Sequence, residues 1–405
     1  MTTPFGYLSV ASPLHDETAV SRVLAPTLAV LHDEGGVPRN AAEDEPRSPL
    51  VIVVGTGGTE AAILDHVRRR RLAAPFEPVL LATHRSHNSL PAALEAMARV
   101  RLDGGRGRIV QVDAADPAQL RTAVVDVAAI HRMHAARLGL VGMPSEWLVA
   151  SVPQAKLVRQ CWGVELVPID NALPIAAHPH VDPGAAREVA VHFAGTAEPS
   201  ADLLSAAALH PALLDVIESA HVDAVTVRCF DYLGELGTSG CVALAQLNDA
   251  GVVAGCEGDV ASAVAMLLVR SLLDLPSWMA NPAYVDVDGN RVLLAHCTVA
   301  PSLVEDVELH THFESGIGIG LRGRFARQWV TLLRLGGSAL ERFFVAEGEI
   351  EQAGESDDLC RTQVTVRLEG VRAGSLLEDP LGNHLLLVPG RHRERLERWW
   401  QLAFG

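Results

Sequence analysis

Aromatic residues and positive charges are both scarce in this chain of 405 residues. Phe, Trp and Tyr make up only 4% of the residues, which argues against an extended groove that stacks the rings of a polysaccharide. Asp and Glu number 49 against 33 Lys and Arg, so the formal net charge is −16. That negative charge argues against a nucleic-acid partner or an anionic-membrane partner.

Targeting and cross-linking signals are also missing. The first residues, MTTPFGYLSV, contain neither a basic segment nor a small-residue cleavage site, so we expect no signal peptide. No apolar run approaches the roughly 18 residues of a membrane-spanning helix. The six cysteines form no CxxC pair, and we expect reduced core thiols rather than disulfides or zinc ligands. These absences predict a cytoplasmic protein with no membrane partner.

The familiar nucleotide and hydrolase motifs are absent as well. The turn GTGGTE at 55–60 is neither GxGxxG nor GxxxxGK[ST], so it gives only weak support for nucleotide binding. A loop that contacts a sugar or opens a helix is the better interpretation. No GxSxG segment supports a Ser-His-Asp triad.

Hydrophobic residues make up 49% of the chain, enough for a large core. Strands alternate with helices as far as a strand at 138–141, which predicts a doubly wound parallel α/β layer. A second α/β layer follows. The basic run 68–71 is expected to end a helix and to be solvated.

After about Pro282, short apolar runs are separated by Gly, Asp, Asn and Pro without intervening helices. This pattern predicts a mostly β, barrel-like domain, closed by an amphipathic helix at 391–402. The predicted domains are an N-terminal α/β domain at 1–144, a second α/β domain at 145–275 and a β-barrel-like domain at 276–405.

The stretch CEGD places Glu257 and Asp259 at the start of a predicted helix. The helix dipole favours acids there, so a simple cap is the plain alternative. Downstream, Asn281, His296 and His384 each adjoin an apolar run. A carboxylate, an amide and two imidazoles can together hold a divalent cation, and such N/O ligands suit Mn²⁺ or Mg²⁺ better than Zn²⁺.

Other polar residues are candidates for substrate binding. His84 and Asn88 follow a predicted strand, although Asn88 could instead cap the next helix. His310, His312 and Glu314 alternate along a predicted strand and would share one face, either as functional groups or as an exposed surface. Trp147 is a further candidate, with interdomain packing as its alternative.

Several segments together resemble the L-fucose isomerase/L-arabinose isomerase-like family over about residues 51 to 390. They are GTGGTE, NSLPAALE, VGMPSEWLVAS, CEGDVASAVAMLL, LLAHCTVA, THFESGIGIGLRG and GNHLLLVPG. The resemblance implies two α/β domains and a C-terminal β-barrel domain. It also implies aldose–ketose interconversion with Mn²⁺, or with Mg²⁺ or Co²⁺, in homo-oligomeric trimers or hexamers whose active sites lie between subunits.

The resemblance also implies a set of metal ligands. The first metal carboxylate of the family falls on Glu257, and its histidine ligands fall on His296 and His384. The second carboxylate falls on Asn281, which can offer an oxygen to a hard cation but cannot accept a proton. This difference implies weaker metal binding, another base or a changed reaction.

The function that we expect is isomerisation of a monosaccharide, with deoxy and sulfonated sugars among the candidates, through an ene-diol intermediate. Glu257 would be metal ligand and general acid/base, and Asp231 or Asp286 would carry the second proton. The alternatives are a metal-dependent sugar aldolase or epimerase, motivated by Asn281, and a non-catalytic sugar-binding protein on the same scaffold.

Overall fold

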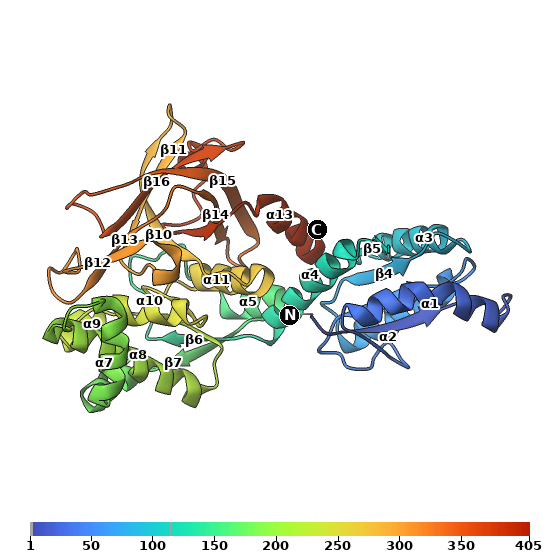
Figure 1. Ribbon diagram of the computed structural model, residues 1–405, viewed down its shortest axis with the longest axis horizontal. Helices are drawn as coiled ribbons and strands as arrows, with labels where there is room; N and C mark the ends of the chain where they lie inside the picture. The colour runs from blue at the N-terminus through green and yellow to red at the C-terminus, as the bar shows by residue number, and fades with distance from the viewer. Residues whose placement is uncertain (1–2, 114) are drawn as a thin grey trace. The chain divides into compact units, whose positions relative to one another are not determined.

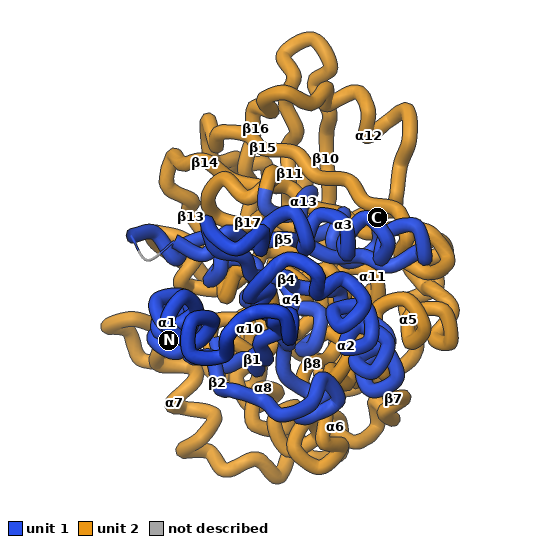
Figure 2. The backbone as a smooth tube through the Cα atoms, turned by 90° about the vertical axis from the view of Figure 1, so that its right-hand side faces the viewer, with its two compact units in different colours: residues 1–132, 395–405 blue, residues 133–394 orange. Residues whose placement is uncertain are grey.

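A computed structural model describes residues 3–113 and 115–405. The chain divides into two compact units: residues 1–132 with 395–405 form unit 1, and residues 133–394 form unit 2 (Figure 2).

Unit 1 is built on a parallel five-stranded sheet in the order β2-β1-β3-β4-β5. Its strands are β1 (Phe5–Val10), β2 (Gly36–Pro38), β3 (Leu50–Val54), β4 (Val79–Thr83) and β5 (Gly107–Gln111). Its helices are α1 (Glu17–Asp33), α2 (Glu60–Ala73), α3 (Ser89–Leu102) and α4 (Ala118–Ala135), whose last residues belong to unit 2. Every residue of β3 and β4 is buried, as expected for strands covered on both faces.

Two expectations for unit 1 are wrong. Arg70 is not solvated, because its guanidinium is buried and donates through Nε to Glu77 Oε2 at 2.8 Å. The terminal helix α13 (Arg393–Phe404) does not close a barrel domain, since it belongs to unit 1 from residue 395 onward. There the Trp399 indole donates to the Asp126 carbonyl at 3.0 Å.

Unit 2 begins with a parallel four-stranded sheet in the order β7-β6-β8-β9. Its strands are β6 (Arg137–Val141), β7 (Glu165–Ile169), β8 (Ala224–Val227) and β9 (Val253–Gly255). The strand expected to end the first layer is therefore β6 at the centre of the second sheet. The helical segments are α5 (Ala155–Trp162), α6 (Ala172–Ala177), η1 (His178–His180), α7 (Pro183–Ala194), α8 (Ala201–Ala220), α9 (Asp231–Glu235), α10 (Cys241–Asp249) and α11 (Val260–Leu273).

The remainder of unit 2 contains a closed antiparallel barrel in the order β10-β11-β16-β15-β14-β17 (Figure 1). Its strands are β10 (Trp278–Asp286), β11 (Arg291–His296), β14 (Trp329–Gly336), β15 (Arg342–Ala353), β16 (Thr362–Glu369) and β17 (Leu385–Pro389). Beside it lie η2 (Pro301–Leu303), the hairpin of β12 (Asp306–His310) and β13 (Gly320–Arg324), and α12 (Ser375–Glu378). The predicted fold class, two parallel α/β layers and a C-terminal β-barrel, is confirmed.

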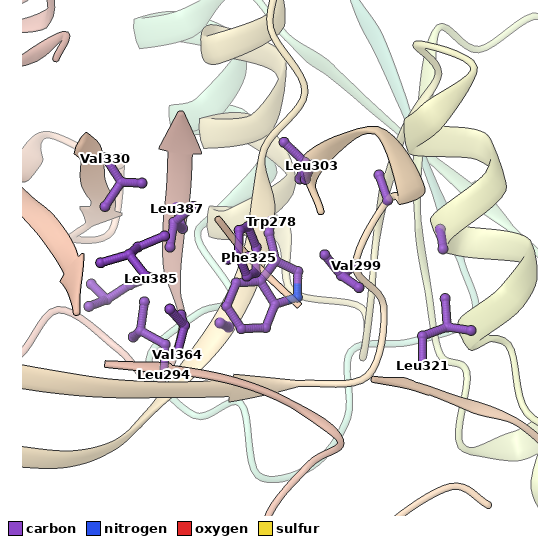
Figure 3. Close-up of a cluster of buried hydrophobic side chains, with 14 of the residues drawn as sticks. Trp278, Leu294, Val299, Leu303, Leu321, Phe325, Val330, Val364, Leu385 and Leu387 are labelled. Carbon is purple, nitrogen blue, oxygen red and sulfur yellow. The ribbon is translucent and has the colours of Figure 1, made fainter. Parts of the chain in front are cut away.

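One hydrophobic core joins the barrel to the helices of the second α/β layer. Trp278, Leu294 and Leu387 come from barrel strands, while Phe193 and Leu203 come from α7 and α8 (Figure 3 shows the barrel side). Helix α11, nearly all of it buried, packs against β14 and β17 and against β8 and β9. The barrel and the sheet are therefore held as one body, which fixes the loops that extend from both.

Helix α8 differs from one expectation. It is long and apolar enough to cross a membrane by length and composition alone. In the structure it instead packs against α7 and α10, with Leu203, Leu209 and Leu213 buried. Such burial is typical of a core helix.

Candidate metal centre

Three side chains from distant parts of the sequence meet in unit 2. One ligand atom each of Glu257, His296 and His384 lies within 4.8 Å of the other two. Glu257 Oε1 is 3.8 Å from His296 Nε2 and 3.5 Å from His384 Nε2. Glu257 follows β9, His296 ends β11 and His384 precedes β17. The carboxyl edge of the second sheet and two barrel strands thus create the site.

The backbone around Glu257 is unusual. Glu257 has φ 63°, a left-handed conformation that is uncommon outside glycine and that often marks functional sites. Its carbonyl accepts a hydrogen bond from Ser145 N at 3.0 Å, and Gly258 N donates to the Val227 carbonyl at 3.0 Å. These bonds tie the loop to two neighbouring strand ends, so the Glu257 carboxylate has a defined direction.

Side-chain contacts fix the two imidazole rings. His384 Nδ1 lies 2.8 Å from Asp259 Oδ2, and His296 Nδ1 lies 3.0 Å from Thr298 Oγ1. In each ring the other nitrogen, Nε2, faces Glu257. A histidine whose outer nitrogen is fixed by a polar partner is the usual form of a histidine that binds a metal.

Burial and charge act against each other at this centre. Burial raises the pKa of Glu257, but the adjacent imidazoles of His296 and His384 outweigh it and leave the pKa well below its usual range. Burial lowers the pKa of His384, but the carboxylates of Asp259 and Glu257 outweigh it and raise that pKa. The centre therefore holds an ionised carboxylate next to two rings.

His384 Nε2 is buried without a hydrogen-bond partner. A buried polar atom without a partner is costly, and a bound ligand commonly explains one in a native protein. A divalent cation between Glu257, His296 and His384 would satisfy that nitrogen. The donor set of one carboxylate oxygen and two imidazole nitrogens also fits such a cation.

A narrow cavity adjoins the three side chains. Its lining includes the predicted residues Asn281, His312 and Glu314. It also includes Phe230, Leu233 and Gly240, together with Cys229, Cys241, Cys256, Cys297 and Cys360. The cysteines are free thiols, as expected, but their gathering around this cavity was not predicted. Their scattered positions in the sequence give no sign of it.

Asn281 lies within strand β10. It pairs with Ala295 of β11, directly before His296. The structure thus brings the amide to the same cavity as Glu257 and His296. Its role as a metal ligand stays a prediction.

Trp147 contacts the centre directly. Its indole Nε1 donates to Glu257 Oε2 at 2.6 Å, while half of the residue remains exposed. Its ring meets Phe230 edge to face at 5.0 Å, and Phe230 meets His312 in the same way at 5.6 Å. This aromatic row runs from the half-exposed Trp147 to His312 in the cavity wall.

The two acids predicted as second proton carriers lie elsewhere. Asp231 binds Arg228 Nε and Asn171 Nδ2, each at 2.9 Å, and lines a different hollow at the edge of the second sheet. Asp286 lies beside the β10–β11 turn, accepts from Gly289 N at 2.9 Å and pairs with Arg291. Among the described residues, the carboxylates that line the cavity are those of Glu257 and Glu314.

The histidine pair on the predicted strand is separated. Strand β12 ends at His310, whose ring faces Glu308 at 3.3 Å. His312 lies beyond the strand, is buried and lines the cavity, as does Glu314. The expectation that all three share one strand face is therefore wrong.

His84 and Asn88 belong to unit 1. His84 Nε2 lies 2.9 Å from the Gly55 carbonyl, so the predicted loop contacts the glycine-rich turn. Asn88 occupies the position before α3 in a left-handed conformation, but its side chain makes no capping hydrogen bond. Their role in substrate binding stays a prediction.

Asp259 is confirmed as a helix cap, since it accepts from Ser262 N at 2.8 Å at the start of α11. Its contact with His384 was not predicted, and neither was its ion pair with Arg334 at 3.1 Å. One signal was available: Arg334 is the single charge within the apolar strand WVTLLRLG. A buried strand that keeps one arginine indicates a buried partner.

No protein-family profile matches this chain. It is similar to the sulfoquinovose isomerase of Clostridium sp. (strain MSTE9), with 31% identity over 135 residues, 32% of this chain and 30% of that protein. It is 31% identical over 84 residues to the sulfoquinovose isomerase of Priestia aryabhattai, covering 20% and 19% of the two chains. The sulfoquinovose isomerase of Alkalicoccus urumqiensis is 25% identical over 131 residues, covering 31% and 30%. The matches thus span less than a third of the length of these relatives.

Proposed function

We propose that this chain, a member of the L-fucose isomerase/L-arabinose isomerase-like family, is a divalent-metal-dependent aldose–ketose isomerase that acts on a sulfonated monosaccharide. The metal site is supported by two observations: Glu257, His296 and His384 lie close together, and the buried Nε2 of His384 has no hydrogen-bond partner. The names of the relatives support the sulfonated sugar. Mn²⁺ is the proposed cation because carboxylate and imidazole ligands with open positions suit it.

Glu257, His296 and His384 would hold the metal, which would supply Lewis-acid polarisation of the sugar carbonyl. The protein must move a proton between C1 and C2, which needs a carboxylate within hydrogen-bond reach. Glu257 is one such group. The Trp147 indole holds its Oε2 and so fixes the direction of the carboxylate.

Glu314 is the proposed second proton carrier, in place of Asp231 and Asp286. Its carboxylate lines the cavity, and partial burial raises its pKa. A carboxyl group with a raised pKa can be protonated at a higher pH and can return a proton to the sugar. His312, also in the cavity wall, would orient the substrate hydroxyls.

Glu257→Gln tests the proposal. This variant keeps the shape of the side chain but removes its charge, so we expect bound Mn²⁺ and turnover of sulfoquinovose to fall at least 100-fold together. Metal content is measured by elemental analysis after dialysis, and turnover by separation of the aldose and the ketose. Asp286→Asn is the control, because it removes a carboxylate at the hairpin turn and should change neither quantity. A fully active Glu257→Gln variant contradicts the proposal.

The proposal extends to assembly and location. Met143 and Val149 are 74% and 89% exposed, and such apolar side chains support a homo-oligomer that covers this segment. Free thiols around the cavity support a reducing compartment, such as the cytoplasm. Sedimentation of the wild type and of Val149→Asp tests assembly, and we expect a smaller particle for the variant.

Asn281 keeps a second reaction class open. An amide stands in the cavity where the family resemblance implies a carboxylate, which favours an epimerase or aldolase that needs a different base. Isomerisation of sulfoquinovose by the native protein would rule out this alternative. Isomerisation found only in Asn281→Asp would support it.

A further inference from the structure

A buried ion pair lies behind the candidate metal centre. The side chains of Asp259 and Arg334 are 0% and 2% exposed, and their charged groups are 3.1 Å apart. Moving two charges out of water costs several kcal/mol per ion, so such a pair is retained only where its geometry is well satisfied. Of the two residues, only Asp259 contacts a side chain of the candidate metal centre, through His384 Nδ1, so the burial of Arg334 needs another reason.

Every oxygen of Asp259 has a partner. Oδ1 accepts from Ser262 N at 2.8 Å, which caps helix α11. Oδ2 accepts from Ser262 Oγ at 2.9 Å and from Arg334 Nη1 at 3.1 Å, and it lies 2.8 Å from His384 Nδ1. The carboxylate therefore cannot turn without breaking several hydrogen bonds at once.

Arg334 is fixed just as firmly. Its Nη1 donates to Ser262 Oγ at 2.6 Å, and its Nη2 donates to Ser151 Oγ at 2.6 Å. Its Nε makes a long hydrogen bond of 3.5 Å to the Leu381 carbonyl. One guanidinium thus joins the barrel strand β14 to α11, to the loop containing Ser151 and to the segment before His384.

Gly382, the glycine of the motif GNH, lies where a larger residue would not fit. A Cβ at Gly382 would lie 2.3 Å from Arg334 Nη2, and its φ of 142° is one that side chains rarely adopt. The chain passes against the guanidinium at this point, two residues before His384. Arg334 consequently acts on His384 in two ways: it holds Asp259, which contacts the ring, and it packs against the backbone at Gly382, which leads to the ring.

This arrangement determines which nitrogen of His384 is free. Asp259 and Glu257 are both ionised and can only accept, but Asp259 Oδ2 lies 2.8 Å from Nδ1 whereas Glu257 Oε1 lies 3.5 Å from Nε2, so the neutral ring carries its proton on Nδ1. Nε2 then presents its lone pair toward Glu257, 3.5 Å from Oε1. That is the orientation and the tautomer that a metal ligand needs.

We propose that Asp259 and Arg334 are positioning residues that hold the His384 ring with Nε2 directed at the metal centre and so set its affinity for a divalent cation. The effect on affinity rests on the proposed metal-dependent function, whereas the ring tautomer does not. The two parts can therefore fail separately in experiment.

The first experiment needs no metal. Long-range ¹H–¹⁵N NMR on the metal-free full-length protein, at a pH where the ring is neutral, reports the tautomer of His384, assigned by comparison with His384→Gln. We expect the Nδ1–H tautomer in the wild type and a loss of this preference in Asp259→Asn. An Nε2–H tautomer in the wild type would overturn the inference whatever the protein binds.

The second experiment titrates Mn²⁺ into the metal-free protein without sugar and follows free Mn²⁺ by electron paramagnetic resonance. We expect Asp259→Asn to weaken binding about 10- to 100-fold. Asp182→Asn is the matched control, because Asp182 caps α7 in the same unit through Ala185 N and should leave affinity unchanged. Equal affinity in both variants would overturn the inference, whereas a wild type that binds no Mn²⁺ would instead refute the proposed function.

Ser151→Ala provides a second variant in case Asp259→Asn does not fold. It removes one hydrogen bond of Arg334 and leaves the ion pair with Asp259 in place. We expect a smaller loss of Mn²⁺ affinity, about threefold, and restoration by Ser151→Thr, which keeps the hydroxyl. An unchanged affinity in Ser151→Ala would contradict the role of Arg334.

Discussion

At the scale of single residues, Glu257 carries the candidate site. It combines a left-handed backbone, a buried carboxylate and two facing imidazoles. A backbone conformation that costs free energy persists only where the surroundings impose it. Here the surroundings are the backbone bond from Ser145 and the indole of Trp147, both from the loop after β6.

Trp147→Phe tests the indole contact. The variant keeps a ring against Phe230 but loses the 2.6 Å hydrogen bond to Glu257 Oε2. We expect about tenfold weaker Mn²⁺ binding, since outer partners of a ligand typically contribute that much. Calorimetric titration measures the affinity. Phe230→Leu removes the contact between the two rings and keeps the indole donor. Weaker Mn²⁺ binding in Phe230→Leu but not in Trp147→Phe would show that ring packing, and not the hydrogen bond, supports the site.

Asn281→Asp tests the missing carboxylate. Asn281 lines the cavity with Glu257 and His296, so an aspartate there would add a negative oxygen ligand. We expect Mn²⁺ binding to tighten about tenfold, because hard cations prefer carboxylate to amide oxygen. The same titration measures the change. Unchanged affinity would show that position 281 does not contact the cation, and Asn290→Asp, at the β10–β11 turn, controls for added charge.

At the scale of elements, the loop between β9 and α11 does most to form the site. Gly258 has φ 73°, and a Cβ there would lie 2.7 Å from the Pro144 Cα. The loop can therefore approach the segment after β6 only with glycine at this position. This close approach brings Trp147 to Glu257. Gly258 therefore supports the site because it leaves room for the segment that contains Trp147.

Gly258→Ala and Gly237→Ala separate two effects. Both glycines have positive φ, but nothing lies within 4 Å of a Cβ at Gly237. We expect Gly237→Ala to lower the free energy of unfolding by about 1–2 kcal/mol, the cost of a left-handed alanine. Gly258→Ala should lower the free energy of unfolding by more than this. It should also weaken Mn²⁺ binding, because the backbone at Pro144 must move to make room for the new Cβ. Denaturant unfolding and Mn²⁺ titration measure the two quantities, and equal results for the two variants would contradict this account.

At the scale of the whole molecule, the candidate centre lies entirely within unit 2. Ligand binding stabilises the folded unit that contains the site, by about 2.7 kcal/mol when the free ligand is 100 times its Kd. The barrel shares one hydrophobic core with helices α7, α8 and α10 of the second α/β layer, so the barrel and this layer should gain stability together.

Scanning calorimetry of the full chain checks that expectation. We expect Mn²⁺ to raise the melting temperature of the transition assigned to unit 2 by several degrees, and EDTA to reverse the rise. Glu257→Gln should abolish the shift, while Asp286→Asn should keep it. A shift that persists in Glu257→Gln would place the bound metal elsewhere.

Local sequence patterns predicted the parts of the molecule that local physics controls. The alternation of strands and helices became the first parallel sheet, and the short apolar runs after Pro282 became the barrel strands. The motifs of the family resemblance identified Glu257, His296 and His384, which the structure brings together. Each of these features depends on a few adjacent residues, and so it is visible in one stretch of sequence.

The tertiary structure alone decided which distant residues meet. Strand β6 joined the second sheet, and α13 joined unit 1, because strand pairing and helix packing depend on partners far along the chain. The same reason explains why Glu314 and not Asp231 or Asp286 lines the cavity, and why Arg334 meets Asp259. The sequence by itself determined the residue types of the candidate metal centre and the layers of the fold. Only long-range packing decided how His384 is oriented and which carboxylates share its cavity.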